Sequence, residues 1–113
     1  LTKKNKNIFL FGKGEEKRDH IYSRIVVSYI YFFLKKELNG IFNLASGQVT
    51  SFYEIAKWFQ ANKNKKINVL FRKRKGPMPH KGYRSFNINL IKKKIKEIKI
   101  KKLEYYLSEA FLK

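Results

Sequence analysis

The strongest fold signal in the chain is the stretch IFLFGKGEEKRDHIY, which runs from Ile8 to Tyr22. Its first four residues are apolar and stop at Gly12-Lys13-Gly14, a pattern that predicts a short buried strand followed by a turn. The charged residues 15–19 predict a loop, and residues 20–22 predict a second short strand. A dinucleotide-binding glycine loop is disfavoured, because position 17 is Lys and no helix opens after the glycines.

Downstream of Tyr22, predicted helices alternate with short predicted strands. A nearly continuous apolar run predicts a helix over 25–38 that ends at Asn39-Gly40, since glycine commonly ends helices. Ser51 followed by Glu54 is a capping box, which predicts the start of a second helix. The other expected elements are strands at 41–45 and 67–71, a long loop at 72–85, a short helix at 88–94 and an amphipathic final helix on Leu103, Tyr106, Leu107, Ala110 and Phe111.

Length and composition favour one folded domain. The chain has 113 residues, of which 43% are hydrophobic and 16% aromatic, so it is no disordered basic tail. A chain of this size is expected to bury roughly two-thirds of its extended surface around one modest core. The absence of cysteine excludes a disulfide framework, a thiolate metal site and a thiol nucleophile. The apolar run at 25–34 is shorter than the roughly 20 residues of a membrane span, and a cytoplasmic location is expected.

The net charge of +19 indicates an anionic partner, such as nucleic acid, an acidic membrane surface or a phosphorylated small molecule. It arises from 27 Lys and Arg against 8 Asp and Glu, and 22 of the 27 are Lys. Arg is the residue better suited to bidentate phosphate recognition. Because Ile, Asn, Phe and Tyr are abundant as well, we attribute much of the excess charge to compositional drift on solvated faces.

Several isolated motifs have simpler structural explanations. Tyr53 and Lys57 match a Tyr-x-x-x-Lys acid/base pair, in which the Lys lowers the pKa of the Tyr. Here the pair follows a helix cap and lacks a preceding Rossmann strand, turn and helix. His20 and His80 have no third ligand at metal spacing, so no metal site is predicted. The basic run at 72–75 fits a nucleic-acid patch or a solvated loop.

The stretch at 11–22 resembles the C-terminal part of NAD-dependent epimerases/dehydratases, the extended short-chain dehydrogenases/reductases that act on nucleotide sugars. That family carries an aromatic-Gly-x-Gly loop, then Arg-Asp, then an aromatic strand that leads into a helix. Further landmarks follow in the family's order over nearly the whole chain. They are Phe42-Asn43-Leu44-Ala45-Ser46-Gly47 with Thr50-Ser51, then Gly76-Pro77-x-Pro79-His80-x-x-Tyr83-Arg84-x-Phe86-Asn87, and finally Leu103-Glu104-Tyr105-Tyr106-Leu107.

This resemblance implies a mixed α/β fold and a single partial domain over 1–113, the small substrate-binding C-terminal portion of such an enzyme without its N-terminal Rossmann domain. It implies that Arg18 and Arg84 contact the diphosphate or ribose of a nucleotide-diphosphate sugar. The nucleotide base would lie along Leu10-Phe11. Paired, charge-assisted hydrogen bonds suit a guanidinium to a diphosphate.

The same resemblance implies NAD(P) only for the full-length parent enzyme, for which a homodimer is one expected form. No catalytic, cofactor-binding or metal-binding residue is assigned in this chain. Alone it is expected to be catalytically inert, because hydride transfer needs the cofactor domain. The chain starts at Leu1 and its only methionine is Met78. It is therefore expected to be a piece of a longer protein, with the missing Rossmann domain as its partner.

Some alternatives stay open. Arg18 can instead form an exposed ion pair with Glu15 or Asp19. Where the family has two acidic residues after the tyrosine, this chain has Ser23-Arg24, and Ser23 is then expected to cap the following helix. The alternative function is that of a small basic nucleic-acid-binding protein, and a third is a scaffold without a ligand.

Overall fold

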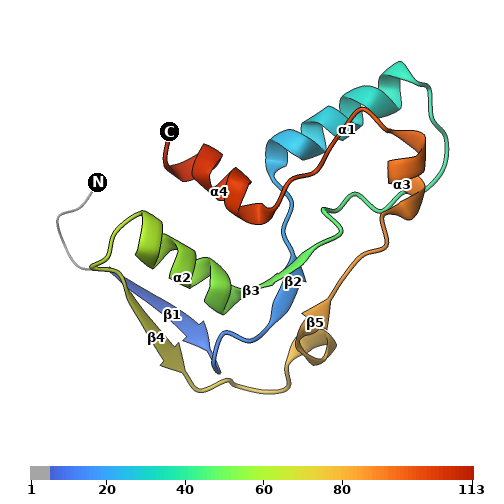
Figure 1. Ribbon diagram of the computed structural model, residues 1–113. Helices are drawn as coiled ribbons and strands as arrows, with labels where there is room; N and C mark the ends of the chain where they lie inside the picture. Colours follow the sequence, from blue (N-terminus) through green and yellow to red (C-terminus); the bar gives the residue numbers. More distant parts are fainter. Residues whose placement is uncertain (1–5) are drawn as a thin grey trace.

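A flat, open layer of short strands and helices makes up the protein, as the computed structural model shows (Figure 1). The structure describes residues 6–113, so residues 1–5 of the predicted domain lie outside the described residues. The Cα radius of gyration is 16.9 Å, against about 13 Å for a compact domain of this length. The principal extents are 48 × 37 × 16 Å. Because the molecule is thin, few side chains are enclosed on all sides.

The elements form two small sheets and four helices within the described residues. In chain order they are β1 (Asn7–Phe11), β2 (Lys17–Asp19), α1 (Ser23–Lys35), β3 (Val49–Ser51), α2 (Phe52–Asn62), β4 (Asn68–Arg72), a 3-10 turn at Pro79–Gly82, β5 (Tyr83–Arg84), α3 (Asn89–Lys94) and α4 (Leu103–Phe111). β1 pairs with β4 in parallel, and β2 lies between an antiparallel β3 and a parallel β5. This arrangement confirms the mixed α/β class.

The two-stranded sheet packs one face on α2, which crosses it in Figure 1. Ile8 and Leu10 of β1 share that face with Val69 of β4, and all three are half-buried. On the opposite face, Phe9 is 47% exposed. Alternation of this kind is what a sheet covered on one side produces. The predicted strands at 8–11 and 67–71 are thus confirmed to within a residue.

The predicted cap of α2 is confirmed. Ser51 is the N-cap residue, and its hydroxyl accepts a 3.0 Å hydrogen bond from the backbone N–H of Glu54. This bond satisfies one of the free N–H groups in the first turn of the helix. Farther along, the ring of Phe59 lies 4.9 Å from that of Phe111, which joins α2 to the final helix α4. Both helices lie where their periodicity predicted them.

The enclosed core is smaller than the length of the chain predicts. Its centre is Tyr29 of α1 with Ile91 of α3 and Ile95 just after it, each at most 1% exposed. Elsewhere α1 carries exposed apolar side chains, and Leu34 is 76% exposed. The expected modest core is therefore present, but it is small, and many large apolar side chains stay exposed. A layer 16 Å thick has too little interior to hold a larger core.

The strand after the glycine turn lies three residues earlier than predicted. Residues 17–19, which were expected to lie in a loop, form β2. Residues 20–22, which were expected to form a strand, pair with no strand of the described residues. Two strands flank residues 17–19, since Arg18 is opposite Thr50 on one side and Arg84 on the other. The pairing of distant segments therefore overrides the local apolar pattern at 20–22.

The first helix also differs from prediction at both ends. Tyr22 is its N-cap and makes no side-chain cap bond, so Ser23, which could have replaced the family's acidic cap, is the first residue of the helix instead. The helix ends at Lys35 rather than at Asn39-Gly40. Glu37 takes a left-handed φ of 51°, and the N–H of Leu38 donates to the carbonyl of Phe33. These bonds form a Schellman end, which a non-glycine residue rarely provides.

The predicted strand at 41–45 is absent. Its backbone pairs with no strand of the described residues, and Ile41 is 95% exposed. An isolated apolar run needs a neighbouring strand before it forms a ladder. Separately, none of the helices in residues 6–113 is long and apolar enough to cross a membrane.

Candidate functional site

The two arginines assigned to substrate binding lie opposite each other on neighbouring strands. Arg18 of β2 is the register partner of Arg84 of β5, in a parallel pair. Partnered residues of parallel strands project to the same face, with strands about 4.8 Å apart. The chain therefore brings together two residues that are 66 positions apart in sequence. Arg84 is exposed, and its guanidinium carbon lies 5.0 Å from the centre of the Phe86 ring.

Arg18 is held in place by protein acceptors. Its Nη2 donates to Glu16 Oε2 at 2.7 Å and to the carbonyl of Pro79 at 3.1 Å, and its Nη1 donates to the carbonyl of Lys17 at 3.0 Å. A guanidinium carries five N–H donors. Among the described residues, the Nε–H and one Nη1–H of Arg18 are left for a further acceptor.

Glu16 is the carboxylate that pairs with Arg18, and it pairs with Arg74 as well. The Glu16 side chain is 11% exposed, and the side chains of both arginines are 19% exposed. Neither carboxylate that sequence reasoning considered, Glu15 or Asp19, contacts Arg18. Glu15 instead accepts a 2.7 Å bond from the backbone N–H of Lys13. Backbone hydrogen bonds at Glu15 itself and at Lys13 lower the pKa of the Glu15 carboxyl.

The strand end at Leu10-Phe11 joins this group through Arg74. Arg74 Nη2 lies 3.5 Å from the carbonyl oxygen of Phe11, and its Nη1 pairs with Glu16. The ring of Phe11 is 56% exposed. The side chain of Leu10 points to the opposite face, where a Cβ on Gly14 would come within 2.6 Å of it. The backbone of β1 thus borders the arginine group, while Leu10 itself packs toward α2.

An apolar hollow of about 570 Å³ lies beside the end of β1. Gly12, Lys13, Tyr53 and Phe71 line it. The rings of Tyr53 and Phe71 are stacked, with centres 6.1 Å apart and planes 19° from parallel. Two nearly parallel rings offer a surface on which a flat heteroaromatic ring can stack.

Charge and donor geometry together make this region suited to an anion. The guanidinium groups of Arg18 and Arg74 share one carboxylate, that of Glu16, and Arg84 is the register partner of Arg18 on the neighbouring strand. The excess of positive charge and the open side of Arg84 favour a phosphate, because a guanidinium binds phosphate through paired N–H donors. We name this set the arginine site.

Sequence reasoning missed Glu16 and Arg74. Both lie in segments that were read as solvated loops, the charged stretch at 15–19 and the basic run at 72–75. Their pairing depends on a turn that brings the end of β4 beside the end of β1, where the N–H of Gly12 donates to the carbonyl of Arg72.

The other motifs carry no catalytic geometry within the described residues. Lys57 Nζ donates to Gln60 Oε1 at 2.6 Å, while Tyr53 stacks on Phe71, so the two do not form an acid/base pair. No cluster of three or more His, Asp and Glu side chains in residues 6–113 is placed to hold a metal ion. The strand β2, and not a helix, follows Gly12-Lys13-Gly14 in the chain. The first turn of α2 meets the glycine turn from a distant part of the sequence, and the N–H of Tyr53 there donates to the carbonyl of Gly14 at 2.9 Å.

The fold is shared with a nucleotide-sugar epimerase. Over 88% of its length, the chain is similar to a UDP-N-acetylglucosamine 4-epimerase from Methanobrevibacter ruminantium M1, solved in complex with UDP-N-acetylmuramic acid, with a TM-score of 0.68 and 17% sequence identity. The matched region spans 31% of that epimerase. No family model matches the sequence. At this level of identity the likeness establishes the fold, and it supports the predicted resemblance at that level.

Proposed function

We propose that this chain is the nucleotide-sugar-binding portion of an NAD(P)-dependent epimerase, dehydratase or reductase. The observation that carries the proposal is the register of Arg18 against Arg84 in a fold shared with a UDP-sugar epimerase. In this proposal the diphosphate accepts hydrogen bonds from Arg84 and from the remaining N–H donors of Arg18. Glu16 and Arg74 hold Arg18 in position.

The base of the nucleotide would lie beside the end of β1. The hollow with the stacked rings of Tyr53 and Phe71 adjoins the turn after Phe11. Backbone groups there and an apolar ring surface suit a flat base, while the arginine site suits the negative charge beside it. The chain supplies no hydride acceptor of its own, so we expect it to bind without turnover.

Binding of UDP and dTDP, followed by isothermal calorimetry and by ¹⁵N amide shifts, tests the proposal. Arg84→Ala is the informative variant, because Arg84 is exposed, packs on the Phe86 ring and takes no part in the Glu16 ion pairs, which its loss leaves in place. We expect affinity to fall about tenfold or more, as for the loss of a charge-assisted hydrogen bond. Arg24→Ala removes the same charge from an exposed position of α1 and serves as the matched control.

Two results would count against this function. Failure of both nucleotides to shift amides around Arg84 in a folded chain would remove the binding claim. Equal losses in Arg84→Ala and Arg24→Ala would indicate that net charge alone attracts the nucleotide. The claim of a larger enzyme is tested separately by reading the coding sequence upstream of Leu1. A glycine-rich strand, turn and helix with a second Tyr-x-x-x-Lys is expected there.

A further inference from the structure

A second cavity, of about 700 Å³, lies on the other side of β2 from the first sheet. Its walls come from α3, from residues 95–100 and from the turn at 46–48. Neither Arg18 nor Arg84 lines it, although Phe86, on which the guanidinium of Arg84 packs, does. We name it the lysine cavity, after Lys92, Lys96 and Lys99 in its walls.

The turn at 46–48, which forms one wall of the cavity, is held by specific hydrogen bonds and by a glycine. Asp19 accepts hydrogen bonds from Ser46 and from the backbone N–H of Gly47, each 2.8 Å long. Gly47 has a φ of 78°, and a Cβ there would come within 2.6 Å of Ile88 Cδ1. Both conditions require glycine, since other residues rarely adopt this φ. The turn therefore holds a fixed position against α3.

One part of the lysine cavity, its floor, consists of apolar side chains and lies against the buried core. Tyr29 and Ile95, both from the buried core, line it together with Ile88, Ile98 and Ile100. Because the core residues are fully enclosed, the floor cannot collapse to fill the space without unpacking α1 from α3. A packed floor below an open mouth is typical of preformed small-molecule sites.

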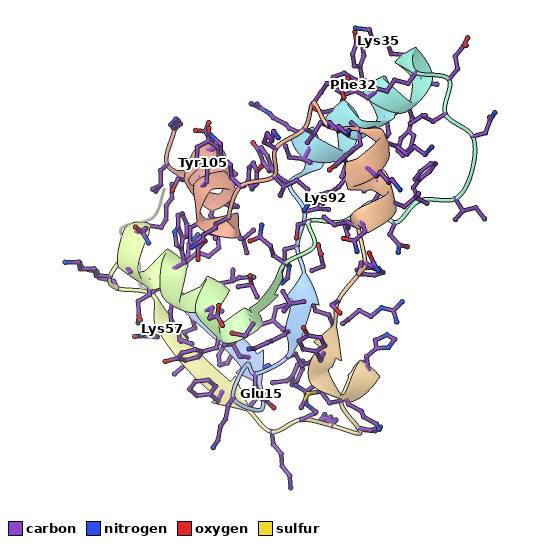
Figure 2. The ribbon with its side chains drawn as sticks, turned by 45° about the vertical axis from the view of Figure 1, so that its right-hand side comes forward. Glu15, Phe32, Lys35, Lys57, Lys92 and Tyr105 are labelled. Carbon is purple, nitrogen blue, oxygen red and sulfur yellow. The ribbon has the colours of Figure 1, made fainter. Side chains whose placement is uncertain are left out.

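The charged side chains that line the cavity are lysines, while the carboxylate of Asp19 is hydrogen-bonded to the turn that forms one wall. Lys92, Lys96 and Lys99 line it without an Asp or Glu, and within residues 6–113 none of the three forms an ion pair. The nearest acidic residue along the chain, Glu97, pairs with Lys36 at 2.7 Å instead. Figure 2 shows Lys92 on the side of α3 toward the middle of the molecule, whereas Lys35 and Lys57 lie at its edge. Three lysines in the lining outnumber the single carboxylate of Asp19 behind one wall, and this excess of positive charge attracts a multivalent anion.

We propose that the lysine cavity binds a phosphorylated small molecule. The phosphate faces the three lysines, and the organic body rests on the floor of isoleucine and tyrosine side chains. The amide side chains of Gln48 and Asn89, which also line the cavity, supply further polar contacts to hydroxyl groups. A volume of about 700 Å³ is within the range of about 300–1,000 Å³ found for such ligands.

A small molecule suits this site better than a nucleic acid. A polymer backbone is bound by a stripe of positive charge along a surface or groove. Here the lysines surround a hollow with an apolar floor, a shape that encloses a compact ligand. Nucleic-acid binding remains a distinguishable outcome of the test.

The test is a titration of the ¹⁵N-labelled chain with glucose 6-phosphate, inorganic pyrophosphate and glucose, at two salt concentrations. We expect both phosphates to shift the amides of Gly47, Gln48 and Lys99, with the sugar phosphate bound more tightly and glucose inactive. The triple variant Lys92→Gln, Lys96→Gln, Lys99→Gln should lose about tenfold or more in affinity, as removal of three charge contacts predicts. The matched control is Lys65→Gln, Lys66→Gln, Lys73→Gln, which removes the same charge outside the cavity.

Three results would overturn the proposal. The first is the absence of shifts at the cavity amides, and the second is an equal loss of affinity in the two triple variants. The third is that a single-stranded oligonucleotide binds more tightly than glucose 6-phosphate and is weakened equally by both triple variants. The positions of the amide shifts separate this site from the arginine site, since glucose 6-phosphate should shift Gly47, Gln48 and Lys99 and leave Lys17 and Arg18 unchanged. In the first of the three results, shifts confined to Arg18 and Arg84 would mean that the phosphate binds at the arginine site instead.

Discussion

Asp19 accepts two hydrogen bonds from Ser46, one from the backbone N–H and one from the hydroxyl, each 2.8 Å long. The other carboxylate oxygen of Asp19 accepts the N–H of Gly47. One side chain at the end of β2 thus fixes a turn 27 residues away in sequence. The same residue follows Arg18, so it links the arginine site to the wall of the lysine cavity.

Asp19→Asn should destabilise the fold by about 2 kcal/mol, because an amide has one acceptor oxygen where the carboxylate uses two. Urea unfolding followed by circular dichroism measures the change. Glu104→Gln, an exposed position at the start of α4, removes the same charge and should cost little. Equal losses in the two variants would contradict a specific role for Asp19.

Glu16→Gln should cost about 2 kcal/mol, because it leaves the half-buried guanidinium groups of Arg18 and Arg74 without their shared carboxylate. Added salt should restore part of the loss, since it screens the repulsion between the two arginines. Unfolding curves at low and high salt measure both effects. Glu15→Gln is the adjacent control, and a similar salt response there would indicate a general charge effect.

Tyr29→Phe should leave stability unchanged or raise it by up to about 1 kcal/mol. The Tyr29 side chain is fully buried, and its hydroxyl oxygen has no hydrogen-bond partner among the described residues. Burial also raises the pKa of this hydroxyl. Thermal unfolding gives the comparison, with Tyr29→Ala expected to lose about 3–5 kcal/mol through the cavity it creates. A clear loss in Tyr29→Phe would mean that the hydroxyl has an acceptor in solution.

Lys36→Gln should raise the pKa of Glu97 toward its ordinary value of 4.5. The hydrogen bond from Lys36 is the main cause that lowers this pKa. A lowered folded-state pKa stabilises the fold above the unfolded-state pKa, and this contribution is lost as pH falls through the folded-state value. Carboxyl ¹³C shifts of Glu97 against pH measure the change. An unaltered titration in Lys36→Gln would rule out the contact in solution.

Local signals in the sequence were enough to locate the elements that depend on local physics. The hydroxyl of Ser51 caps α2 because capping involves residues three apart. The periodicity of α4 likewise needs no distant partner. The resemblance to an epimerase rested on ordered short motifs, and the shared fold agrees with it.

The sequence could not supply what depends on distant pairing. The register of Arg18 with Arg84 arises because β5 happens to join β2, although β5 is only two residues long. The contact of Glu16 with Arg74 needs the same long-range closure. Conversely, the run at 41–45 has the composition of a strand, but no strand of the described residues lies beside it. Composition alone therefore predicted a strand that does not form.

The pairing of β1 with β4 has a consequence for how the chain folds. Their first hydrogen-bonded side chains, Asn7 and Asn68, are 61 residues apart. During synthesis β1 therefore emerges from the ribosome before β4 and stays unpaired until β4 has emerged. The helices α1 and α2 can form from local contacts in that interval. Assembly of the sheet should then limit the folding rate, as long sequence separation between contacts slows folding. Until β4 is available, the backbone edge of β1 is exposed. We expect a chaperone to bind the chain most readily at this stage.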